Sequence, residues 1–99
     1  MFVYRLSVGV AAGQVLEQSG NRLSVAFVNR GGADIYLGRD ATVSALTGLT
    51  VKPGDFFSFA SDFDEYWAIA AAPATALEIV EVLGFLPSQL AQTEGGREL

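Results

Sequence analysis

Turn-forming residues divide this chain into short apolar segments. Their regular spacing constrains its fold more than any other feature. The apolar segment RLSVAFVN (22–29) is followed by the turn residues NRGG (29–32) and by a second apolar segment, IYLG (35–38). A linker then leads to the turn residues KPGD (52–55). Asparagine and glycine tolerate the positive φ of tight turns, and Pro-Gly fits the two central positions of a type II turn. The segment therefore predicts consecutive antiparallel strands separated by turns.

The same pattern extends over most of the chain. We predict strands at residues 3–10, 22–29, 34–38, 49–51, 56–60, 66–71 and 76–83. The strands at 22–29 and 34–38 are expected to form a hairpin, and residues 11–19 are expected to be a connection. About seven short strands at regular spacing are typical of an all-β fold, a single antiparallel β-sandwich.

The pattern stops after Leu83, which divides the chain into a β-sandwich domain (1–83) and a C-terminal arm or tail (84–99). A length of 99 residues allows one domain. The arm has no periodicity, but its first half contains Phe85, Leu86 and Leu90, and a solvated tail seldom carries such residues. We expect the arm to dock on a neighbouring subunit or to pack back on its own domain.

Alternation within the predicted strands assigns a core and an exposed apolar patch. Adjacent strand residues face opposite sides, so Phe56 and Tyr66 are expected to point outward as a subunit contact. Glu81 falls on the predicted core face, where a carboxylate needs a cationic partner such as Arg5 or Arg22. The predicted core consists of Leu23, Val25, Phe27, Ile35, Leu37, Phe57, Phe59, Trp67, Ile69, Leu77 and Ile79.

The residue types available for catalysis are few. The chain contains no histidine and no cysteine, which removes the usual general base, thiol chemistry and the commonest metal ligands. Asp62, Asp64 and Glu65 form an acidic segment that matches the calcium-loop pattern only in part, and a solvated turn is the favoured interpretation. We expect a protein that is not an enzyme and that binds no cofactor or metal.

Charge and hydropathy limit the possible partners. The formal net charge is −5 and the six basic residues are isolated, so no patch follows a phosphate backbone and nucleic acid is not expected. No segment has the roughly 20 apolar residues of a membrane-spanning helix, and no membrane partner is expected. Only 17% of the residues are charged, which favours a surface partly covered by other subunits.

Several motifs together resemble one kind of protein. They begin with an arginine-started strand, an Asn-x-Gly turn and IYLG, and they continue with a G-L-x-x-x-P-G step and the apolar run YWAIA. The residues are Arg22 to Val25, Asn29 to Gly31, Ile35 to Gly38, Val43, Gly48, Leu49, Pro53, Gly54 and Tyr66 to Ala70. Over residues 22–82 the chain resembles small β-sandwich proteins of bacteriophage virions, of the capsid decoration (cement) or head-fibre-base type.

The resemblance implies a structural role. A protein of this kind would bind the outer surface of a phage capsid after assembly in the host cytoplasm, and would stabilise the shell through subunit-seam contacts. Its partners would be the major capsid protein and further copies of itself, with a homotrimer favoured. A neck, tail or fibre-base component and a carbohydrate- or receptor-binding module, using Tyr66 or Trp67, are the alternatives.

Overall fold

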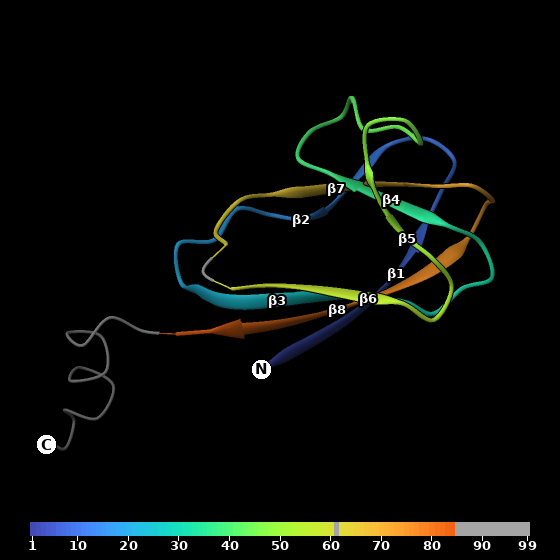
Figure 1. The fold of residues 1–99 in the computed structure, drawn as a ribbon. Helices are drawn as coiled ribbons and strands as arrows, with labels where there is room; N and C mark the ends of the chain where they lie inside the picture. Colours follow the sequence, from blue (N-terminus) through green and yellow to red (C-terminus); the bar gives the residue numbers. More distant parts are fainter. Residues whose placement is uncertain (61, 85–99) are drawn as a thin grey trace, which may run out of the picture.

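Within residues 1–60 and 62–84, which the computed structural model describes, the chain forms two antiparallel sheets packed face to face (Figure 1). The strands in chain order are β1 (Phe2–Val8), β2 (Gly13–Leu16), β3 (Arg22–Asn29), β4 (Ile35–Gly38), β5 (Leu49–Val51), β6 (Phe56–Ala60), β7 (Tyr66–Ala70) and β8 (Thr75–Leu83). The predicted all-β sandwich is confirmed.

The strands are arranged as a jelly roll. One sheet has the order β1-β8-β3-β6 and the other has the order β2-β7-β4-β5. Apart from β4 and β5, strands that follow one another in the described sequence lie in different sheets. This alternation gives an eight-stranded jelly roll, in which β8, the last strand, lies between β1 and β3.

The predicted hairpin of 22–29 and 34–38 is wrong, because β3 pairs with β6 and β8 while β4 pairs with β5 and β7. The buried side chain of Asn29 holds the corner between the sheets. Its Nδ2 donates to the carbonyl oxygens of Ala33 at 2.7 Å and Val51 at 2.8 Å, while its backbone carbonyl accepts from Gly54 N at 2.9 Å. The turn residues 29–32 therefore lie where the chain passes from the sheet of β3 to the sheet of β4.

The turn at 52–55 has the predicted form but joins different sheets. Gly54 has a φ of 85°, and Asp55 N donates to Lys52 O at 2.9 Å, as in a type II turn. The turn carries the chain from β5 to β6, which belong to opposite layers. A second correction concerns residues 13–16, predicted as part of a connection, which form β2 and pair with β7.

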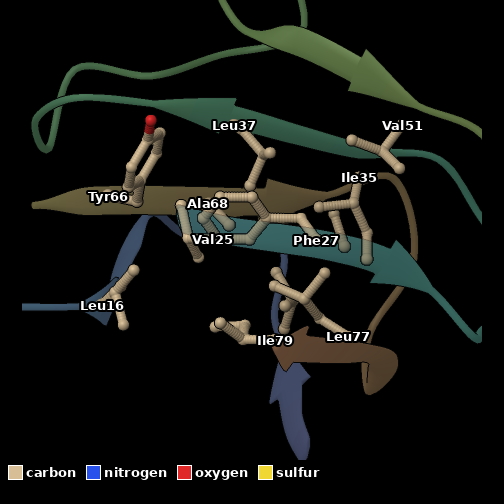
Figure 2. Close-up of a cluster of buried hydrophobic side chains, with 12 residues drawn as sticks. Leu16, Val25, Phe27, Ile35, Leu37, Val51, Tyr66, Ala68, Leu77 and Ile79 are labelled. Carbon is tan, nitrogen blue, oxygen red and sulfur yellow. The ribbon is translucent and has the colours of Figure 1, made fainter. Parts of the chain in front are cut away.

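The core lies between the two sheets (Figure 2). Phe27 contributes its ring from β3, with its centroid 4.7 Å from that of Tyr66 on β7. Of the predicted core, the structure buries Val25, Phe27, Ile35, Leu37, Leu77 and Ile79, while Phe57 and Phe59 are partly buried and pack against that cluster.

The predicted phase of β7 is inverted. Tyr66, Ala68 and Ala70 are buried, and Trp67 and Ile69 lie half-buried on the outer side of their sheet. The reason is volume: Phe27 and Phe59 reach across from the facing sheet towards Tyr66. Small alanines therefore suit the rest of the inward face of β7, and larger side chains point outward.

Leu23 is also not in the core, because its side chain is 56% exposed. The pairing of β3 with β8 is irregular between Arg22 and Ser24, so the alternation changes phase there and Arg22 is buried instead. Phe85, Leu86 and Leu90, the predicted contact residues of the arm, lie outside the described residues.

Candidate interaction surface

The outer face of the β1-β8-β3-β6 sheet is apolar over much of its width. The pairing registers place Val3, Val80, Ala26 and Ser58 in one row across the four strands, since directly paired residues share a face. The side chains that make this outer face apolar are Val3, Ala26, Val28, Phe56, Val80 and Val82. A solvated sheet face is usually polar, whereas on this face apolar residues outnumber the polar ones, which are Arg5, Ser7, Ser24, Ser58 and Glu78.

Phe56 is the largest exposed side chain on this outer face, at 65% exposure. It pairs with Val28 on β3, and Val28 pairs in turn with Glu78 on β8. The outward orientation of Phe56 agrees with the sequence prediction. Tyr66 does not join it, because Tyr66 is buried on β7 in the other sheet.

A cluster of charges interrupts the apolar surface at Glu78. This carboxylate is 7% exposed, and its Oε1 lies 2.9 Å from Arg5 Nη2 and 3.3 Å from Arg30 Nε. The hydrogen bond from Arg30 and the charges of both arginines hold the pKa of Glu78 below its usual range. The carboxylate is therefore charged at neutral pH and neutralised locally, so it does not break the outer face with an unpaired charge.

The opposite end of the sheet is fixed by a buried arginine. Arg22 is fully buried and its Nε donates to Glu81 Oε2 at 2.8 Å, which is one of the two pairings expected for Glu81. Its remaining nitrogens donate to the carbonyl oxygens of Glu17, Asp62 and Asp64 at 2.5, 3.0 and 2.8 Å. One guanidinium therefore ties the β2–β3 and β6–β7 connections to β8.

The acidic segment of residues 62–65 is organised by ion pairs and hydrogen bonds. Arg39 Nη2 lies 3.0 Å from Asp62 Oδ2, and Arg39 Nη1 pairs with Asp64. Burial works to raise the pKa of Asp62, but hydrogen bonds from Tyr66 and Asp64 N and the charges of Arg39 and Arg22 outweigh it and lower that pKa. These carboxylates therefore serve to hold the loop, as ion-pair and hydrogen-bond partners.

Within residues 1–60 and 62–84, no group of three or more potential ligand side chains is placed to hold a metal ion. The same residues include no helix that is long and apolar enough to cross a membrane.

Sequence reasoning placed Phe56 on the surface but missed the rest of the outer face. The signal was present in the last strand, where Val80 and Val82 alternate with Ile79 and Leu83, so that both faces are apolar. A strand that is apolar on both faces in a sandwich of two layers has one face left for a partner.

Neither the scan of protein-family models nor the search of curated proteins gives a match to this chain.

Proposed function

We propose that this chain is a structural protein that assembles with partners through the outer face of its β1-β8-β3-β6 sheet. The observation that carries the proposal is the apolar character of that face. Phe56 is exposed on the edge strand β6, and Glu78, on the inner strand β8, is neutralised by its arginine partners. Small side chains such as Ala26, Val80 and Val82 make a flat surface, which suits close packing against another protein.

The resemblance over residues 22–82 supplies the setting, which is the outer surface of a bacteriophage capsid. In this proposal the chain is a decoration (cement) protein whose partners are the major capsid protein and further copies of itself, with a homotrimer favoured. The jelly roll is compatible with this role, since viral capsid domains use it, but lectins and other proteins use it as well. The proposal assigns no catalytic step and no cofactor.

Two alternatives belong to the same proposal. A neck, tail or fibre-base component would use the same fold and the same apolar face in a smaller number of copies. A carbohydrate-binding module is less well supported, because the burial of Tyr66 leaves Trp67 as the one ring of that pair on an outer surface.

Copy number tests the setting. We would measure the amount of this chain in purified virus particles by quantitative mass spectrometry, relative to the major capsid protein. A simple ratio to the shell subunit, with hundreds of copies per particle, is the expected result. A dozen copies or fewer would favour the neck, tail or fibre base, and absence from particles would overturn the virion role.

The surface itself is tested by substitution of Phe56. Phe56→Lys places a charge on the proposed contact, and we expect it to weaken binding to undecorated particles at least about tenfold, the equivalent of roughly 1.4 kcal/mol. Phe63→Lys is the matched control, because Phe63 is also exposed but lies in the β6–β7 connection. Equal binding by the two variants would remove the outer face from the contact.

A further inference from the structure

The strand β1 is an edge strand whose apolar side chains are left largely uncovered. Its pairing with β8 is regular from Phe2↔Glu81 to Val8↔Thr75, and its other side has no neighbouring strand among the described residues. Tyr4 and Leu6 pair with the buried Ile79 and Leu77, so they face the interior of the sandwich. They are nevertheless exposed, because a groove separates them from the facing sheet.

An apolar groove runs beside β1 on this inner side. It has a volume of about 490 Å³ and lies between Tyr4 and Leu6 of β1 and Val15 and Leu16 of the facing sheet. A smaller hollow of about 160 Å³ continues it, since Leu6 and Val15 line both. The groove therefore follows the length of β1 and has the form that an added strand would cover.

The other edge strands in the described part of the chain are protected, and β1 is not. β2 has four residues and an irregular pairing, β5 has three residues, and β6 is flanked by Asp55 and Asp62. Short edges, irregularities and flanking charges discourage pairing with another chain. β1 has seven residues, no proline and no carboxylate, and its one charge is Arg5.

Electrostatics favours a second copy of this chain at β1 over any other edge. The molecule has a net charge of −5, which opposes self-association over most of its surface. Of the carboxylates near β1, Glu78 is paired with Arg5 and Arg30 and Glu81 with Arg22, while Glu17 also lines the groove. Two copies that meet along β1 therefore bring together an edge whose cross-strand carboxylates, Glu78 and Glu81, are both paired with arginine.

We propose that two copies pair through their β1 strands, antiparallel and related by a two-fold axis, to form a continuous eight-stranded sheet. Such a contact uses the same edge on both copies, so it closes and leaves neither β1 free to extend a fibre. The inward side chains of the second β1 then lie beside Phe2, Tyr4 and Leu6 and cover the mouth of the groove. This inference rests on the proposed function only for the premise that the chain assembles, and it replaces the homotrimer with a two-fold dimer.

The charge of Arg5 restricts the register. In a two-fold antiparallel pair one residue lies opposite its own copy, and side chains of equal parity share a face. Centring on Arg5 would place two guanidinium groups opposite each other, which is unfavourable. Centring on Tyr4 pairs residues 2–6, and centring on Leu6 pairs residues 4–8, so these two registers keep the longest overlap within β1.

Sedimentation equilibrium of the full chain and of two matched variants tests the contact. Val3→Lys adds a charge to the edge strand, and Val10→Lys makes the same change just beyond it; the two valines are 52% and 57% exposed. We expect the parent and Val10→Lys to form dimers, and Val3→Lys to raise the dissociation constant of the contact at least tenfold. A monomeric parent, an oligomer that Val3→Lys leaves unchanged, or an equal weakening by Phe56→Lys, which alters the outer face away from β1, would overturn the proposal.

Single cysteines provide a measurement that does not depend on Val3→Lys remaining folded. The chain has no cysteine, so each of Val3→Cys, Tyr4→Cys, Leu6→Cys and Ser7→Cys contains one thiol. A thiol opposite its own copy lies within disulfide reach. We expect Tyr4→Cys or Leu6→Cys to form covalent dimers at least tenfold faster than Val3→Cys and Ser7→Cys; equal rates in all four would contradict β1 pairing.

The outcomes separate this inference from the proposed function. Dimers that depend on β1, together with absence of the chain from virus particles, would overturn the virion role and leave the β1 contact standing. Decorated particles whose chain shows no β1-dependent association would support the virion role and overturn the contact.

Discussion

At the scale of single residues, Arg22 has more polar partners than any other arginine in the described part of the chain. It is fully buried, is paired with Glu81, and satisfies the carbonyl oxygens of Glu17, Asp62 and Asp64. Removal of one partner from a buried ion pair leaves an uncompensated charge and typically costs about 3–5 kcal/mol. We expect Arg22→Met to lower the free energy of unfolding by about that amount, measured by urea denaturation.

Arg39→Met is the control for this prediction. The side chain of Arg39 is 53% exposed and pairs with Asp62 and Asp64 at the surface. Exposed ion pairs contribute about 0–1 kcal/mol, so this variant should remain close to the parent. If the two variants were equally stable, Arg22 would have no special role in joining the connections.

Residue-scale sequence reasoning found the need for Glu81 to have a cation but not the phase of β7. A buried carboxylate is destabilising unless a nearby cation pairs with it. The need for a cationic partner therefore follows from the strand pattern alone. The choice between Tyr66 and Trp67 depended instead on how much volume Phe27 and Phe59 occupy across the core. That volume is a property of the facing sheet, and local alternation does not contain it.

At the scale of elements, the β7–β8 turn stores strain at Ala74. Ala74 has a φ of 57°, in the left-handed region. The left-handed conformation costs an L-residue with a Cβ roughly 1–2 kcal/mol, and this cost is absent for glycine. Because glycine also loses more chain entropy, we expect a net gain of about 0.5–1 kcal/mol from Ala74→Gly in thermal or urea unfolding.

Ala76→Gly is the matched comparison, since Ala76 lies two residues later in β8 and no positive φ is found there. Glycine in a strand interior destabilises by about 0.5–1 kcal/mol relative to alanine. The two substitutions should therefore have opposite signs. A loss of stability in both would show that the backbone strain at Ala74 is not significant.

Most elements could be predicted from the sequence, but their pairing could not. The strands that alternate clearly, such as β3 and β8, were located to within a residue or two. β2 was missed because it is four residues long, begins with Gly13 and pairs irregularly with β7. The corner at Asn29 was read as a hairpin because a local turn signal is the same whether the next strand joins the same sheet or the facing one.

At the scale of the whole molecule, paired carboxylates and a buried tyrosine define the pH range of stability. The pKa values of Asp62 and Glu78 are lowered in the folded state, so their contribution is present above about pH 4 and is lost as pH falls further. Burial and the hydrogen bond to Asp62 raise the pKa of Tyr66, so its contribution is present below about pH 10 and is lost at higher pH.

Urea denaturation across this pH range checks the prediction. The free energy of unfolding should be nearly constant between the two limits and should fall on either side of them. In Glu78→Gln the free energy of unfolding should fall less steeply at acidic pH. In Tyr66→Phe it should fall less steeply at alkaline pH. Unchanged slopes in both variants would mean that other groups control the pH dependence.

The position of β8 has a consequence for how the protein is made. β8 lies between β1 and β3, so β1 pairs with a strand that is synthesised after β2 to β7, as in Phe2↔Glu81. Until β8 has been synthesised, β1 lacks its neighbour in the sheet and its apolar residues remain available to other chains. Pairing of such distant segments is slow, and uncovered strands promote aggregation. A nascent chain of this fold therefore carries an uncovered β1 until β8 is available to pair with it.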